Sequence, residues 1–135
     1  MKLLITSEDV YNKLNINIAQ FLRIDGQPNA STVVEHFLEE IESDVKEYIG
    51  AFAYRGRAQA EWYFGQDRYA QPLTDALLAQ VQYVCQNGRI SDYGGIMLTN
   101  GTVNRFSLDE RVQSNMAPKT HTTLENAGLL YRGKL

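Results

Sequence analysis

The sequence has 135 residues, enough for one domain with a buried core. Its composition, 44% hydrophobic and 21% charged, is that of an ordinary globular protein. The net charge of −3 and the absence of a basic cluster disfavour high-affinity binding to nucleic acid, and the single cysteine excludes a disulfide within the sequence and a multi-cysteine zinc site.

Charge is unevenly distributed along the chain. Residues 1–50 contain nine acidic and four basic residues, a net charge of −5, whereas residues 51–135 carry a net charge of +2. The apolar run at residues 1–5 is too short for a signal peptide, and no segment approaches the length of a membrane span. We therefore expect a protein that is kept in a reducing cytoplasm.

The first fifty residues predict a short helix followed by a long one. Thr6 or Ser7 can cap the first helix, and residues 15–17 interrupt it before one or two further helical turns. Residues 31–49 form the strongest predicted helix, with Thr32 and Glu35 in the pattern of a capping box. Its apolar residues recur three or four apart and predict a core face: Val34, Phe37, Leu38, Ile41, Val45, Tyr48 and Ile49. The opposite face is predicted to be an exposed acidic stripe: Glu35, Glu39, Glu40, Glu42, Asp44 and Glu47.

The middle of the chain gives a weak pattern and then a firm one. Residues 58–64 could be helical, and we expect the aromatic cluster at residues 62–64 to serve core or interface packing rather than base stacking. Residues 72–87 predict a second firm helix, beginning at Pro72 and placing four residues on a core stripe. These residues are Leu73, Leu77, Val81 and Val84.

The last third of the chain predicts a β-hairpin and a short terminal helix. Asn100-Gly101 lies between two β-prone runs, which is a strong hairpin signal. Pro118 suits the first turn of a helix and Gly128 suits the position just after its end. The apolar residues 129–131 then need burial in the chain's own core or against another subunit.

No sequence motif indicates catalysis or a bound cofactor. Phosphate-binding glycine loops, nucleophile elbows and zinc-protease motifs are all missing. His36 with Glu40, and His121 with Glu125, supply only two potential ligands each, too few for a zinc site. We therefore expect a protein that is not an enzyme and that holds no metal or cofactor.

The order of these elements resembles the head–tail connector, or adaptor, proteins of tailed bacteriophages. The similarity covers the capped N-terminal helix, the helices at residues 32–49 and 73–88, and the β excursion at residues 94–108. Its most specific part is the ending: Met116-Ala-Pro118, Leu124 and Ala127-Gly-Leu-Leu-Tyr-Arg-Gly133 resemble the short helix and GL-x-YRG segment of connectors from phages of Gram-positive hosts. Residues 52–70 match no pattern of the family.

The resemblance implies a non-catalytic virion protein. Such a protein docks on the portal as a ring, typically of twelve subunits, extends the DNA channel and receives the stopper or tail-completion protein. It would be found at the head–tail interface, and in the host cytoplasm during assembly, where it can be a monomer before docking. An acidic channel wall would let DNA pass without specific binding, and four residues of the acidic stripe are the candidates for that wall: Glu35, Glu39, Glu42 and Glu47.

The expected architecture is mainly α: a single domain over residues 1–135, with a helical bundle over about 6–88 and a hairpin and C-terminal arm with an extended tail over about 94–135. Candidate subunit or portal contacts are Ile96, Leu98, Val103, Phe106, Leu124, Leu129, Leu130, Tyr131 and Arg132. Deletion of residues 128–135 is expected to leave a folded helical monomer that cannot join the portal. The alternatives are a small helical DNA-binding regulator, another non-catalytic interaction domain, or an uncharacterised small enzyme.

Overall fold

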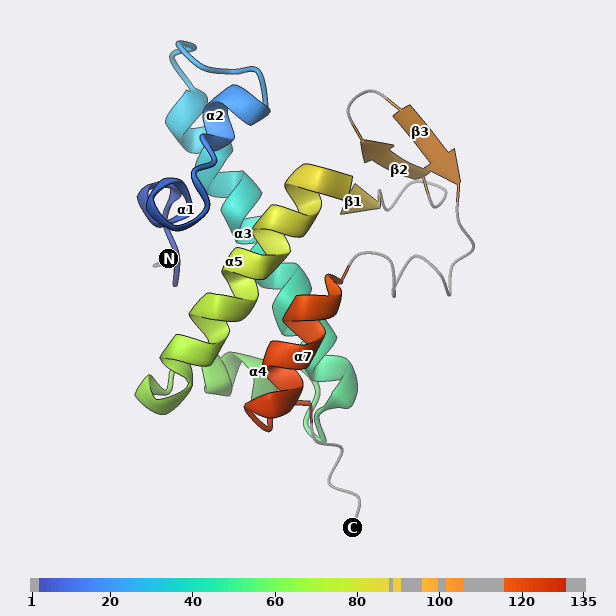
Figure 1. Ribbon diagram of the computed structural model, residues 1–135. Coiled ribbons are helices and arrows are strands. Elements are labelled where there is room, and N and C mark those ends of the chain that lie inside the picture. Colours follow the sequence, from blue (N-terminus) through green and yellow to red (C-terminus); the bar gives the residue numbers. More distant parts are fainter. Residues whose placement is uncertain (1–2, 88, 91–95, 100–101, 106–115, 131–135) are drawn as a thin grey trace.

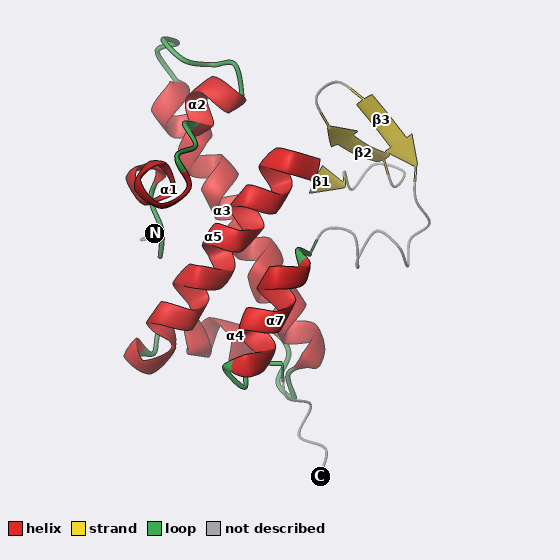
Figure 2. Ribbon diagram, viewed as in Figure 1, coloured by secondary structure: helices red, strands yellow, loops and turns green. Residues whose placement is uncertain are grey.

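The computed structural model describes residues 3–87, 89–90, 96–99, 102–105 and 116–130. Helices dominate these residues, as Figures 1 and 2 show, so the prediction of a mainly α protein is confirmed. Within the described ranges, no helix has the length and hydrophobicity needed to cross a bilayer.

Two short helices begin the chain. In α1 (Ser7–Leu14), the Thr6 hydroxyl accepts from the Asp9 amide at 3.3 Å and the Asp9 carboxylate accepts from the Thr6 amide at 3.0 Å, which completes a capping box. Asn15 ends the helix in the left-handed conformation, at φ 58°. The Asn17 side chain then caps α2 (Ile18–Phe21) by accepting from the backbone of Gln20. Both helices agree with the prediction from sequence.

Helix α3 (Ala30–Phe52) is the longest in the described structure, and it begins earlier than expected. The predicted capping box of Thr32 and Glu35 is wrong, because Thr32 already lies inside the helix. A turn before the helix brings the Ala30 amide to the Gln27 carbonyl at 3.1 Å, so the helix starts at Ala30 without a side-chain cap on Asn29. Val34, Leu38, Ile41, Val45 and Ile49 form its buried stripe, as predicted.

A close turn connects α3 to α4 (Arg57–Phe64). A Cβ atom at Gly50 would lie 2.9 Å from the Arg57 amide nitrogen, so only glycine permits this approach. Helix α4 agrees with the helix expected over residues 58–64. The single-turn 3₁₀ helix η1 (Asp67–Tyr69) leads into the next helix.

Helix α5 (Ala70–Asn87) occupies the centre of the bundle, and Figure 1 shows it crossing α3, with α7 (Pro118–Asn126) beside it. It begins two residues before Pro72, which therefore lies within the first turn rather than at the first position. The predicted stripe of Leu73, Leu77, Val81 and Val84 is buried, but so are other faces of the helix. The additional buried residues are Ala76, Leu78, Ala79 and Gln80. Burial on several faces follows because α1, α3 and α7 all contact this helix.

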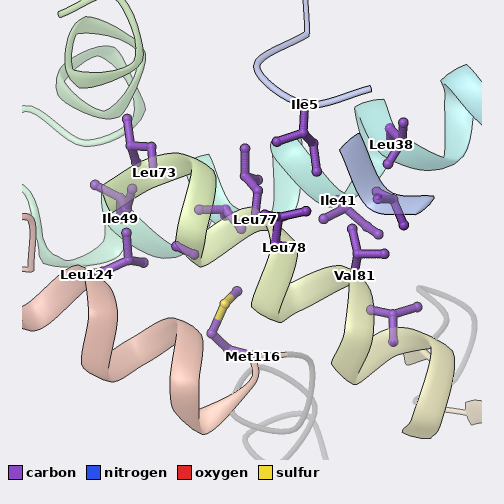
Figure 3. Close-up of a cluster of buried hydrophobic side chains, with 14 of the residues drawn as sticks. Ile5, Leu38, Ile41, Ile49, Leu73, Leu77, Leu78, Val81, Met116 and Leu124 are labelled. Atoms are coloured by element: carbon purple, nitrogen blue, oxygen red, sulfur yellow. The ribbon is translucent and has the colours of Figure 1, made fainter. Parts of the chain in front are cut away.

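The core forms where these helices meet. Figure 3 shows Ile49, Leu73 and Leu124 close together at one end, and Leu38, Ile41 and Val81 at the other. Met116, from the segment before α7, points toward α5 and is buried. Side chains from both ends of the chain therefore complete one hydrophobic cluster.

Three short strands follow α5: β1 (Arg89–Ile90), β2 (Ile96–Thr99) and β3 (Thr102–Arg105). They pair antiparallel in the order β1-β2-β3, with Leu98 opposite Val103. The predicted turn residues, 100–101, lie outside the described residues. The hairpin excursion therefore stays a prediction, and nothing in the sequence had indicated the pairing of β1 with β2.

Candidate interaction surfaces

The C-terminal segment is anchored in the chain's own core. The Leu129 amide donates to the Leu124 carbonyl and the Gly128 amide to the Glu125 carbonyl, each at 3.0 Å, with Gly128 at φ +78°. These two bonds form a Schellman motif, whose usual apolar contact is supplied here by Leu129 and Leu124. Leu124, Leu129 and Leu130 are 0%, 1% and 9% exposed. Two of the three apolar residues at 129–131, Leu129 and Leu130, are thus buried in this chain without a partner, and the third, Tyr131, lies outside the described residues.

Polar contacts fix α7 on α5 from inside the interface. The Gln80 side chain, fully buried, accepts from the Ala117 amide at 2.9 Å, just before Pro118 begins the helix. The buried Thr120 hydroxyl donates to the Ala76 carbonyl at 3.1 Å. Burial removes these polar groups from water, so each needs a hydrogen-bond partner inside the protein. Both bonds therefore help to set the register of the two helices.

The other predicted contact residues can be placed only in part. Ile96 and Leu98 lie in β2 and Val103 lies in β3, and only their backbones are described. Phe106, Tyr131 and Arg132 lie outside the described residues. A role for any of them in subunit or portal contacts stays a prediction.

The predicted acidic stripe needs one correction. Glu35 and Glu47 are exposed and Glu39 is partly exposed, but Glu42 is buried. The Glu42 carboxylate accepts from the Leu4 amide at 3.1 Å and lies 3.4 Å from the Lys46 ammonium group, with both side chains 8% exposed. Glu42 therefore cannot be a channel-facing residue, because the N-terminal segment covers it.

Lys46 has a second partner on α4. Its ammonium group lies 5.0 Å from the centre of the Phe64 ring, a distance at which a cation is attracted to an aromatic face. The pair of Glu42 and Lys46 therefore joins three segments: the chain before α1, α3 and the end of α4. The sequence analysis had placed Glu42 on the exposed face of the helix.

A cluster of Tyr48, His121 and Glu125 joins α3 to α7. The Tyr48 hydroxyl is hydrogen-bonded to His121 Nδ1, and His121 Nε2 lies 3.9 Å from the Glu125 carboxylate. Burial, and then the negative charge of Glu125, raise the pKa of Tyr48 above its ordinary value. A phenol with a raised pKa keeps its proton at neutral pH and is a poor base or nucleophile, so this cluster is suited to holding α7 rather than to catalysis.

Each histidine of the two predicted histidine–acid pairs has an acidic side chain beside it in the structure. His36 Nε2 lies 4.0 Å from the Glu39 carboxylate, and His121 Nε2 lies 3.9 Å from the Glu125 carboxylate, as expected for the second pair. Across the residues that the structure describes, no three His, Cys, Asp or Glu side chains gather closely enough to hold an ion. Cys85 is half-buried, and burial raises the pKa of its thiol to about 11, so it is not an activated cysteine.

Two hollows of the described surface lie toward opposite ends of α3. The first, which we call the N-terminal groove, has a volume of about 570 Å³. It lies between the chain before α1, α1, α2 and the first half of α3. Among the described residues, its lining is mostly apolar and hydroxyl-bearing, with two carboxylates and no basic side chain: Leu3, Thr6, Ser7, Glu8, Tyr11, Asn17, Ile18, Ala19, Ala30, Ser31, Val34, Glu35 and Leu38.

The second hollow, about 420 Å³, lies on α4 and the turn before it. Arg55, Ala58, Gln59, Trp62 and Tyr63 line it; together with Tyr54 we call them the α4 surface. Trp62 is 51% exposed and Tyr54 is 89% exposed. Composition drew attention to the aromatic cluster at residues 62–64, but the sequence could not tell which of its rings face solvent.

Comparisons with protein-family models, curated proteins and solved structures found no match to this chain.

Proposed function

We propose that this protein is a head–tail connector of a tailed bacteriophage, which docks on the portal as a ring. In this role it would extend the DNA channel and present the attachment surface for a stopper or tail-completion protein. Support comes from the order of elements in the sequence and from the mainly helical fold. The protein would act by binding and positioning, with no chemical step.

The observation that carries the proposal is the C-terminal motif. The sequence Ala127–Gly133 supplies the most specific resemblance, and its first four residues form the Schellman end of α7. Leu130, the last described residue, is buried, with only 9% of its surface exposed. The tail that follows it therefore starts from a fixed point on the core, as a segment that binds a partner would require.

The acidic wall of the proposed channel must rest on fewer residues than the sequence indicated. Glu35 and Glu47 are exposed and Glu39 is partly exposed, whereas the buried Glu42 carboxylate contacts the Leu4 amide and Lys46. An exposed negative surface repels DNA phosphates, so these three residues would favour passage without binding.

Electron microscopy of the protein mixed with purified portal tests the proposal. A ring of additional density on the outer face of the portal is expected, and its absence at saturating protein would refute a connector role. The informative variant lacks residues 131–135, because deletion of residues 128–135 would also remove Leu129 and Leu130 from the core. We therefore no longer expect the longer deletion to leave a folded monomer, and the shorter deletion takes its place as the test.

The shorter deletion should keep the helical circular dichroism of the full chain and lose the ring of density. A matched control is Glu47→Gln, which changes an exposed side chain outside the tail and should keep both. Portals that still carry the ring after loss of residues 131–135 would show that the tail is not the docking segment.

A second candidate, an interaction domain with no role in virions, is favoured by the exposed Tyr54 and Trp62. Large aromatic side chains at a surface are typical of binding sites in many classes of protein. Genes for portal and tail proteins beside the gene for this chain would favour the connector, and their absence would favour the second candidate.

A further inference from the structure

Two of the four large apolar side chains that the described structure leaves exposed line the two hollows, and the other two lie on the segments beside them. Tyr11 lines the N-terminal groove, and Phe21 lies on α2, which forms part of the same groove. Tyr54 and Trp62 belong to the α4 surface. Their exposed fractions run from 37% for Phe21 to 89% for Tyr54. Clustered exposed apolar residues, unlike scattered ones, mark interaction sites.

The α4 surface is organised around Trp62. The Trp62 and Tyr63 rings meet edge to face at 5.7 Å, and Tyr63 meets Tyr69 in the same way at 5.0 Å. The Gln59 amide donates to the Tyr63 hydroxyl at 2.7 Å, and the Arg68 guanidinium lies over the Tyr69 ring at 4.7 Å. This bracing holds Trp62 in position before any partner arrives, which lowers the entropy cost of binding.

The N-terminal groove is complementary in character to the α4 surface. Leu3, Val34 and Leu38 give it apolar walls, while Glu8 and Glu35 place carboxylates in its lining. The hollow of the α4 surface contains a basic residue, Arg55, and no acidic one. An indole with a neighbouring guanidinium group fits an apolar groove with neighbouring carboxylates, in both apolar surface and charge.

The two surfaces cannot meet within one molecule. The groove involves residues 30–38 of α3, whereas α4 follows the other end of this helix. At 1.5 Å per residue, Ser31 and Phe52 lie about 32 Å apart along the axis. Figure 1 shows α1 and α2 at one end of the bundle and α4 at the other.

We infer that the α4 surface of one copy binds the N-terminal groove of a second copy, with Trp62 as the anchor and Arg55 facing Glu8 and Glu35. The contact is head-to-tail, because each copy has one α4 surface and one N-terminal groove. In any row of copies, the first and last copies therefore each keep one of these two surfaces free. Such a contact closes into a ring or continues as a filament, depending on the rotation between neighbours. The inference rests on the proposed function and deepens it by naming the surfaces of the ring contact. It takes Glu35 out of the proposed channel wall, which then consists of Glu39 and Glu47, and it is tested without a portal.

Sedimentation velocity from about 10 μM to about 1 mM measures the association directly, since a contact between free copies is expected to be weak. The unchanged protein should sediment faster as its concentration rises. Trp62→Ala and Glu35→Lys should each weaken association by about tenfold or more, because each removes one side of the same contact. A protein that stays monomeric over the whole range would overturn the inference.

Mixing the two variants tests the head-to-tail geometry. Each variant retains one intact surface, so an equimolar mixture should form pairs, whereas neither variant alone should associate. Larger assemblies should not form, because the remaining surfaces of each pair are the altered ones. A mixture that behaves like the separate variants would contradict the contact.

Charge reversal gives a second, independent measurement. Arg55→Glu should weaken association, and mixing it with Glu35→Lys should give assemblies larger than pairs, because the two reversed surfaces are again opposite in charge. Glu47→Lys is the matched control, because it makes the same change in net charge on α3 outside both surfaces and should leave association within about twofold. An equal loss with Glu47→Lys would show that net charge, rather than this contact, governs association. Circular dichroism confirms that every variant is folded.

The outcomes separate this inference from the proposed function. Normal self-association without a ring on the portal would count against the connector role alone. A ring on the portal that forms equally well with Trp62→Ala and Glu35→Lys would count against the contact alone.

Discussion

Two salt bridges in this protein share their spacing and length but lie in opposite surroundings. Glu42 and Lys46 in α3, and Arg57 and Glu61 in α4, are each four residues apart with nitrogen and oxygen atoms at 3.4 Å. The first pair is 8% exposed on both sides, whereas Arg57 and Glu61 are 45% and 57% exposed. Water screens the charges of the exposed pair. In the buried pair, the two charged groups have lost water and contact each other, and in addition Glu42 contacts the Leu4 amide and Lys46 the Phe64 ring.

The comparison extends to the regions around the two pairs. Polar groups in the interior, such as Gln80 and Thr120, have specific partners and fix how helices dock. Polar and aromatic groups on α4 contact one another at the surface, in the region that we infer to bind a second copy. Interior residues should therefore control folding, and α4 residues should control association.

The largest expected effect is on the buried salt bridge. Glu42→Ala should lower the free energy of unfolding by about 3–5 kcal/mol, because it leaves the Lys46 charge and the Leu4 amide without their partner. Urea denaturation followed by circular dichroism measures this change. Glu61→Ala, the matched substitution in the exposed pair, should cost less than about 1 kcal/mol. Similar losses for both variants would mean that burial does not distinguish the pairs.

The next effect concerns apolar burial at the two regions. Leu124→Ala should cost about 2–5 kcal/mol, because it empties a fully buried site beneath the Schellman end of α7. Trp62→Ala removes a larger side chain that is half exposed, and it should cost about 1 kcal/mol or less while weakening self-association. Thermal and urea unfolding of the two variants check this, and a greater loss of stability for Trp62→Ala would contradict the division of roles.

A smaller effect is expected from hydrogen bonds of the glutamine side chain. Gln80→Ala should cost about 1–3 kcal/mol, because the buried Ala117 amide would lose its acceptor. Gln71→Ala is the control: its amide donates to Asp75 at 2.9 Å, but Gln71 is exposed and water can replace it. Faster hydrogen exchange at Ala117 in Gln80→Ala alone would locate the change, and unchanged exchange there would refute the assignment.

The smallest effect is a shift in the reactivity of Cys85. Burial raises its pKa to about 11 from an ordinary value of 9.0, so the folded protein binds the thiol proton more tightly than the unfolded chain. The resulting stabilisation is present below about pH 9 and is lost as the pH rises toward 11. Alkylation of the folded protein should still accelerate through pH 10, whereas in urea it should level off near pH 9, with Cys85→Ser as the blank. A plateau near pH 9 in the folded protein would contradict the shift.

Much of the helical fold could be predicted because its signals are local. Thr6 with Asp9, and Pro118 with Gly128, mark helix ends through bonds that span only a few residues. The stripe from Val34 to Ile49 has the helical period, so its buried face was predicted correctly. The Thr32 capping pattern failed because the turn at Gln27 started the helix earlier, which the pattern alone could not exclude.

The candidate surfaces were less predictable, because exposure depends on what covers each residue. Glu42 belongs to the acidic face by spacing, but Leu4, from a distant part of the sequence, lies over it. Leu129 and Leu130 required burial, and the choice between the core and a partner depended on where α7 docks. The Tyr48 and His121 contact spans 73 residues and left no local signal.

The sequence by itself determined the helices, the ends of the first and last of them, and the need to bury the terminal leucines, because these follow from periodicity and from bonds between near neighbours. Only the tertiary structure decided that α5 is buried on several faces, that Glu42 and Lys46 pair inside the protein, and that Trp62 faces solvent. Those outcomes depend on which distant segments exclude water from a side chain, and no spacing along the chain contains that information.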